Sequence, residues 1–146
     1  MIIVQAENNI PIVLAIKKGE NHIIPFSNFH TIAEAITSGN PMGGDELIHK
    51  TIKYKWLAES VSEKEILLAQ QKFGEVGYFV EPASATVLYA VKKLYSAKKI
   101  EEDAKVVLVL TGTGLKDLSV FSHYHYDVLN SYLEHIETNV QRIISN

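Results

Sequence analysis

The pattern of apolar and polar positions divides the chain into short apolar runs that alternate with amphipathic segments. The runs at 1–7, 56–61, 77–82 and 105–114 predict strands, because they are short and rich in β-branched and aromatic residues. The run at 105–114, KVVLVLTGTG, is the most continuously apolar of them. It therefore predicts a central parallel strand that is buried on both faces.

Helices are predicted between these strands. Ser62 and Glu65 have the spacing of a capping box, which indicates a helix over 62–76. The segment 83–100 carries apolar residues at helical spacing and predicts a strongly amphipathic helix. The other predicted helices are 9–19 with Asn9 as a candidate cap, a short helix from Thr31 to near Gly39, 46–55, and 127–144.

Strands that alternate with helices are typical of an α/β layered domain. We therefore predict a three-layer αβα fold with a mostly parallel sheet over residues 1–118. Residues 119–146 are predicted to form a linker and a C-terminal amphipathic helix.

Composition narrows the classes of function. The 146 residues include no cysteine, which excludes disulfides, thiol nucleophiles and cysteine metal sites. A net charge of −3 gives no basic signal, so we expect neither a nucleic-acid nor a membrane partner. No apolar run approaches the roughly 20 residues that span a bilayer, and the N-terminus lacks the pattern of a secretory signal. We expect a cytoplasmic protein.

The turn that ends the most apolar run is the main candidate for chemistry. The sequence VVLVLTGTGLKD (106–117) fits neither the phosphate loop G-x-x-x-x-G-K-[ST] nor the dinucleotide motif G-x-G-x-x-G. Open α/β sheets bind ligands at the carboxyl ends of their strands, where Thr111 is expected. An uncharged hydroxyl beside two glycines suits a neutral contact to a planar heterocycle. The alternative is a plain turn between a strand and a helix.

Several motifs follow one another in a specific order. They are VQAENNIPIVLAIKKG (4–19), TIAEAITSGNP (31–41), SVSEKEILLAQ (60–70), GYFVEPASATVLYAVKKL (77–94) and VVLVLTGTGLKD (106–117). Together they resemble the C-terminal part of threonine synthase, a pyridoxal-phosphate enzyme of fold type II. Related dehydratases usually end their sheet in a Ser-Gly-Gly-Asn type of turn, so threonine synthase is the better match. The resemblance implies pyridoxal phosphate as cofactor and the conversion of O-phosphohomoserine and water to threonine and phosphate.

The resemblance also implies a set of cofactor-binding residues. In this family the threonine hydroxyl of the TGxGLKD motif contacts the pyridine nitrogen, which corresponds to Thr111 here. For Glu81 and Ser84 of the EPASA motif the alternative role is a helix cap, and for Asn40 it is a plain Gly-Asn-Pro turn. The complete set of candidates is Thr111, Gly112, Gly114, Glu81, Ser84 and Asn40.

Two parts of the family's active site are not found in this sequence. The Schiff-base lysine of threonine synthases lies in a Ser/Phe-Lys-Asp-Arg motif, and their cofactor phosphate is held by a Gly-rich loop. The pair Lys116-Asp117 belongs to the terminal motif and does not replace that lysine. We therefore predict that the chain holds no catalytic residue of its own and is inactive without an N-terminal threonine synthase half. The alternative is a non-catalytic binding, regulatory or dimerising remnant of the fold.

The C-terminal segment departs from the family pattern. The apolar stripe of the predicted last helix either folds back on the domain or pairs with a second copy. We favour self-association, because a truncated sheet would also leave an edge exposed. His123 and His125 would face one side of an extended chain, as metal ligands do, with Asp127 or His135 as a third ligand. A polar linker is the simpler interpretation, so no metal site is predicted.

Overall fold

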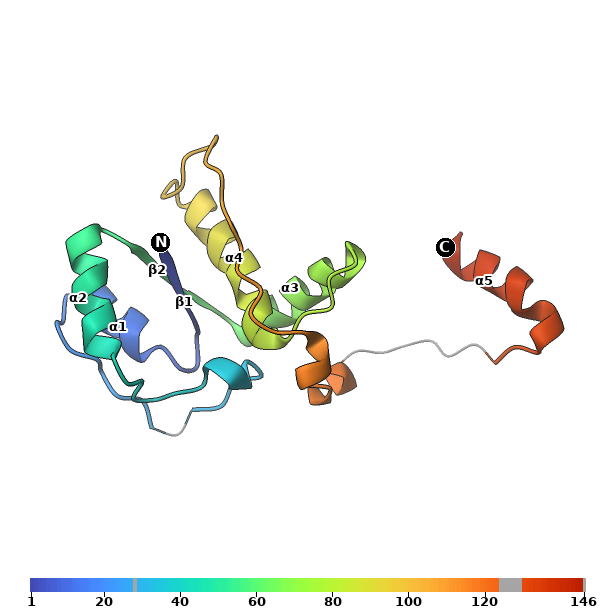
Figure 1. The fold of residues 1–146 in the computed structure, drawn as a ribbon, viewed down its shortest axis with the longest axis horizontal. Coiled ribbons are helices and arrows are strands. Elements are labelled where there is room, and N and C mark those ends of the chain that lie inside the picture. The colour runs from blue at the N-terminus through green and yellow to red at the C-terminus, as the bar shows by residue number, and fades with distance from the viewer. Residues whose placement is uncertain (28, 124–129, 146) are drawn as a thin grey trace.

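The structure is a computed structural model that describes residues 1–27, 29–123 and 130–145. Two strands and five helices carry the fold in these ranges (Figure 1). They are β1 (Ile2–Ala6), α1 (Pro11–Lys18), α2 (Gly44–Tyr54), β2 (Leu57–Val61), α3 (Glu63–Glu75), α4 (Pro82–Ser96) and α5 (Ile136–Ile144). Short 3-10 helices lie at Glu34–Ile36, Gly114–Lys116, Ser119–His123 and Leu133–His135.

The sheet is parallel and is covered by helices. Strand β1 pairs with β2 so that Ile2 lies opposite Leu57 and Ala6 lies opposite Val61. Successive side chains of a strand point to opposite faces. Ile3 of β1 packs against the cluster of α1 and α2, whereas the next residue, Val4, packs against the cluster that includes α3 and α4. The predicted α/β class with a parallel sheet and a C-terminal helix is confirmed.

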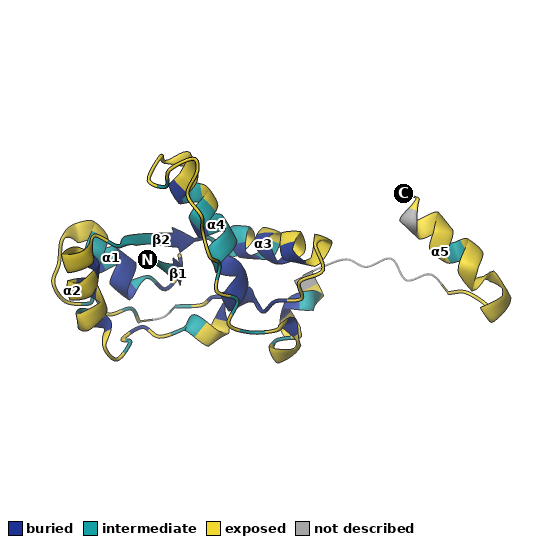
Figure 2. Ribbon diagram, turned by 45° about the horizontal axis from the view of Figure 1, so that its top comes forward, coloured by how far each residue is buried: buried dark blue, intermediate teal, exposed yellow. Residues whose placement is uncertain are grey.

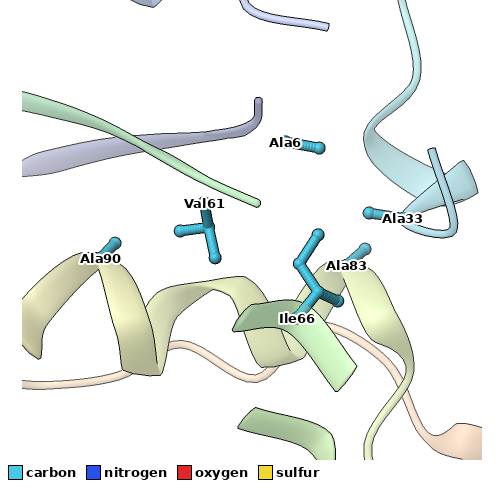
Figure 3. Close-up of a cluster of buried hydrophobic side chains, with 6 residues drawn as sticks. All are labelled: Ala6, Ala33, Val61, Ile66, Ala83 and Ala90. Carbon is cyan, nitrogen blue, oxygen red and sulfur yellow. The ribbon is translucent and has the colours of Figure 1, made fainter. Parts of the chain in front are cut away.

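A cluster of small side chains joins the sheet to α4. Its members are Ala6, Ala33, Val61, Ile66, Ala83 and Ala90, all buried (Figure 3). Alanine lets the strands approach the helix closely, and the branched side chain of Ile66 fills the space between them. This packing fixes the N-terminal end of α4 relative to the sheet.

Residues 105–110 do not form the central strand that their apolar pattern predicts. They run beside α4 without joining the sheet (Figure 1). Leu108 and Leu110 pack against a cluster that α3 and α4 share, but Val107 and Val109 are 85% and 65% exposed. A central strand needs a neighbour on each side, and no such neighbour of this segment occurs in the described ranges. The apolar pattern therefore predicted burial correctly only for the face that carries Leu108 and Leu110.

Helix α1 begins differently from the prediction. Its N-cap position is Ile10, and Asn9 makes no side-chain cap. The first backbone N–H groups of Ile12 and Val13 instead donate to Oε1 of Gln5, at 3.0 and 2.9 Å. Gln5 lies on β1, so one buried amide satisfies the helix terminus and ties it to the sheet. The amide of Asn9 is buried and finds no hydrogen-bond partner among the described residues.

Helix α3 has the capping box that the sequence predicts. The backbone N–H of Ser62 donates to Oε2 of Glu65 at 2.9 Å, and the N–H of Glu65 donates to the Ser62 hydroxyl at 3.4 Å. We expect Ser62→Ala to lower the free energy of unfolding by about 1 kcal/mol, as measured by urea denaturation. Ser62→Thr keeps a hydroxyl that can accept from the Glu65 N–H and donate to the Glu65 carboxylate, so it should lose less. Equal losses in the two variants would contradict a capping role.

The same contacts make this cap sensitive to pH. Partial burial, the largest single effect, raises the pKa of Glu65. Hydrogen bonds from the backbone and hydroxyl of Ser62, with the charge of Lys93, together bring it below the ordinary 4.5. A carboxyl whose pKa is lowered by folding stabilises the protein above its unfolded pKa. That contribution is therefore complete above about pH 4.5 and is lost as the pH falls through the folded value.

The only tryptophan of the chain, Trp56, lies between α2 and β2. Its ring stacks on that of Tyr54 with the centroids 5.7 Å apart. Its backbone N–H donates to the carbonyl of Thr51 at 3.0 Å. The indole is thus fixed to the end of α2.

The last predicted helix is shorter in the structure than in the sequence pattern. Helix α5 begins at Ile136, and Figure 1 shows it apart from the other helices. Its side chains Ile136, Val140 and Ile143 are about half exposed. Of the residues considered for a metal, His125 and Asp127 lie outside the described residues. Every helix in the described ranges is too short or too polar to cross a bilayer.

Candidate functional site

The structure brings two of the motifs of the sequence analysis together at the N-terminus of α4. The N–H of Glu81 donates to the carbonyl of Gly112 at 3.2 Å, and the N–H of Gly114 donates to the carbonyl of Phe79 at 3.0 Å. Val80 and Thr113 form an isolated antiparallel bridge, so the strand predicted over 77–82 is reduced to this one pairing. These backbone bonds hold the TGTG turn against the residues that start α4.

Two hydroxyl groups meet in this arrangement. The oxygen of Ser84 accepts a hydrogen bond from the N–H of Gly112 at 2.8 Å and lies 3.1 Å from the hydroxyl of Thr111. Ser84 also lies within 3.4 Å of a carboxylate oxygen of Glu81. Ser84 and Glu81 are buried, whereas Thr111 is exposed. Thr111 is therefore the exposed residue of this group.

The hydroxyl proton of Ser84 can be donated to either of two acceptors, Glu81 or Thr111. If Ser84 donates to Glu81, Thr111 can donate to Ser84 and keeps its own lone pairs for a ligand. If Ser84 donates to Thr111, the Thr111 proton is free to point outward. The Thr111 hydroxyl can thus either accept or donate a hydrogen bond toward a ligand, and no charged group has to move.

The two glycines of the turn allow close approach of the chain's own side chains. A Cβ atom at Gly112 would collide with the carboxylate of Glu81, and one at Gly114 would lie 2.9 Å from the ring of Phe79. Side chains of this chain therefore fill the space beside both glycines. A contact of either glycine with a cofactor stays a prediction.

A cavity of about 340 Å³ lies beside Glu81, a volume within the range of small-molecule sites. Its lining consists of Glu34, Ala35, Glu81, Pro82, Ala83, Lys116 and Asp117. Three carboxylates against one ammonium make it unsuitable for a phosphate group. Glu34 was not singled out from the sequence, because it lies far from Glu81 along the chain and nothing in its local pattern signals the contact.

Asn40 does not join the hydrogen-bonded group. Its side chain is exposed, and within the described part of the chain it has no hydrogen bond to Ser84 or Thr111. The preceding residue, Gly39, is buried, and its carbonyl accepts from the N–H of Phe26 at 2.9 Å. The Gly-Asn-Pro segment therefore has a structural role at Gly39, and a cofactor role for Asn40 stays a prediction.

Comparison with known proteins identifies relatives over most of this chain. Residues 1–112 match the family described as Pyridoxal-phosphate dependent enzyme. The threonine synthase of Methanocaldococcus jannaschii is 40% identical over 115 residues, which cover 78% of this chain and 28% of that protein. The threonine synthase of Methanosarcina acetivorans is 41% identical, with the same coverage. The chain thus spans 28% of the length of these two relatives.

Solved structures show the same fold. A fungal L-serine ammonia-lyase from Rhizomucor miehei matches 86% of this chain and 41% of its own, with a TM-score of 0.65 and 19% identity. A T.th. threonine deaminase matches 65% of this chain and 34% of its own, with a TM-score of 0.53 and 19% identity. The chain therefore belongs to the family of pyridoxal-phosphate-dependent enzymes, and it resembles the C-terminal part of a threonine synthase.

Proposed function

We propose that this chain supplies the C-terminal part of a threonine-synthase-like active site, in which the Thr111 hydroxyl contacts the ring nitrogen of pyridoxal phosphate. One observation carries the proposal: Ser84, Gly112 and Thr111 form a hydrogen-bonded group at the start of α4, and Thr111 is the exposed residue of this group. The similarity to threonine synthases supports the same assignment.

The chemistry of this group fits a pyridine nitrogen. The nitrogen accepts a hydrogen bond when it is neutral and donates one when it is protonated. The Thr111 hydroxyl can serve both states, because Ser84 can turn its proton either to Thr111 or to Glu81. A carboxylate at this position would hold the protonated form, whereas a hydroxyl does not.

When bound, the cofactor supplies an electron sink for carbanions. The residues of this chain would position it rather than react with it. Ser84 is buried and orients Thr111 by a contact of 3.1 Å, and the N–H of Gly112 fixes Ser84 from the other side. Because Thr111 carries no charge, it would hold the ring in place without fixing the protonation of its nitrogen.

The described residues of this site do not offer a second anchor. The cavity beside Glu81 is lined by three carboxylates and one ammonium, and the excess of negative charge repels a phosphate. We propose that the phosphate anchor and the covalent lysine come from a separate N-terminal half, and that the substrate is O-phosphohomoserine. On this proposal the isolated chain has no threonine synthase activity.

A second candidate function rests on a different observation. The side chains of Leu133, Ile136, Val140 and Ile143 are exposed near or on α5. Such a stripe suits association with a second copy of this helix. In this alternative the chain is a non-catalytic, dimerising remnant of the fold.

The test is a titration of the full chain, co-expressed with the N-terminal part of the Methanocaldococcus jannaschii threonine synthase to supply the phosphate anchor, with pyridoxamine phosphate. This compound has no aldehyde and cannot react with surface lysines. We expect saturable binding by calorimetry and at least a tenfold weaker affinity in Thr111→Val, because the ring nitrogen loses its partner. Thr111→Ser keeps the hydroxyl and should bind like the unmodified chain. Equal affinities for the Thr111→Val and Thr111→Ser variants, or no saturable binding at all, would contradict the proposed site.

A further inference from the structure

A second cavity lies beside α4, between β1 and the segment that follows α4. Its volume is about 370 Å³. We call it the β1 groove and define it by Val4, Val87, Val91, Val107, Leu108 and Val109. Val87 and Val91 belong to α4 and form its floor, while the other residues form its two sides.

Both sides of the β1 groove carry unpaired backbone. Strand β1 has β2 on one edge only, and its other edge has no strand partner in the described ranges. Residues 105–110 likewise form no strand ladder within the part of the chain that is described. Figure 1 shows that β1 and this segment run in the same direction. Two such edges with a gap between them are a template for one more parallel strand.

The lining indicates what can occupy this groove. Its side chains are apolar except for Lys105, so a small polar ligand would find few partners there. An extended peptide differs, because its backbone can pair with both edges while its side chains cover the apolar floor. Val107 and Val109 are exposed in this chain, and Figure 2 shows exposed residues along the segment after α4. An added strand would bury them.

We propose that the β1 groove binds an apolar β-strand of a second polypeptide chain, one that carries the part of threonine synthases absent from this chain. No described residue of this chain fills the groove, and the relatives are long enough to contain such a strand, because this chain spans only 28% of them. The identity of the partner rests on the function proposed above. The groove itself does not, because neither Thr111 nor Ser84 belongs to its lining.

The test uses the N-terminal part of the Methanocaldococcus jannaschii threonine synthase, up to the start of the matched region, as a tagged probe co-expressed with the full chain. We expect the two chains to co-purify as a one-to-one complex. The double variant Val107→Lys with Val109→Lys should weaken binding at least a hundredfold, because charged side chains would be buried at the added strand. Both valines are exposed in the isolated chain, so the variant should still fold.

Val76→Lys is the matched control, since Val76 is 68% exposed at the end of α3 and lies outside the groove. It should bind the probe like the unmodified chain. Failure of the unmodified chain to co-purify, or equal binding by the double variant, would overturn the proposal. So would a dimer of this chain alone that the double variant abolishes, because the occupant would then be a second copy.

The result also separates this inference from the proposed function. Thr111→Val should leave co-purification unchanged, because Thr111 is not part of the groove. A complex that forms but does not bind pyridoxamine phosphate would support the docking strand and contradict the cofactor assignment.

Discussion

Replacing Gly39 with alanine should lower the free energy of unfolding by about 3 kcal/mol, as measured by urea denaturation. The added Cβ would collide with the carbonyl oxygen of Phe26 and lie against the ring of Phe29. The backbone cannot move away easily, because the N–H of Phe26 donates to the carbonyl of Gly39 at 2.9 Å. The strain would therefore fall on main-chain atoms rather than on a flexible side chain.

Gly74→Ala provides the matched control for this substitution. Gly74 lies in α3, and nothing lies within 4 Å of the position of its Cβ. Alanine has a higher helix propensity than glycine, so the free energy of unfolding of this variant should rise by roughly 0.5–1 kcal/mol. If Gly39→Ala also gained stability, the close backbone contact would be wrong and the Gly-Asn-Pro motif would need another explanation.

The second large effect is expected for Ile66→Ala, which should lower the free energy of unfolding by about 3–4 kcal/mol. Ile66 is fully buried, and four of the five residues that share its cluster are alanines (Figure 3). The alanines cannot extend into the space left by Ile66, so part of it would stay a cavity even though larger side chains also pack against the cluster. Unfolding in urea with an unchanged slope would show that stability alone had changed.

Ile52→Ala makes the same chemical change at a surface position. Ile52 is 54% exposed on α2, so the free energy of unfolding of this variant should stay within about 0.5 kcal/mol of that of the unmodified chain. Because Ala83 belongs to the Ile66 cluster and precedes Ser84, Ile66→Ala should also weaken pyridoxamine phosphate binding. A loss of stability below about 1 kcal/mol would mean that the cluster can collapse around the missing side chain.

The elements that depend on local signals could be predicted from the sequence. The capping box at Ser62 placed the start of α3, and the apolar spacing after Pro82 placed α4. The prediction of a strand over 105–110 was wrong, because a strand forms only where its backbone can pair with a neighbouring strand. From residue 107 to residue 110 its side chains alternate between exposed and half-buried, but its backbone has no ladder among the described residues.

The candidate site was predicted only in part. The resemblance to a family indicated Thr111 and Ser84, and the structure shows their hydroxyls in contact. The chain's own spacing gave no reason to pair them. Contacts between distant segments, such as Glu34 with the cavity beside Glu81 or Gln5 with the start of α1, depend on the fold and leave no local pattern.

The stacking of Trp56 on Tyr54 has a practical consequence for all of these measurements. Because Trp56 is the only tryptophan, fluorescence excited at the long-wavelength edge of its absorption, where the seven tyrosines do not absorb, reports the environment at the junction of α2 and β2 alone. Circular dichroism sums every helix, including α5. If α5 melts independently, the ellipticity will begin to fall at lower urea than the fluorescence changes. Only the fluorescence transition would then measure the unfolding of the sheet and its helices.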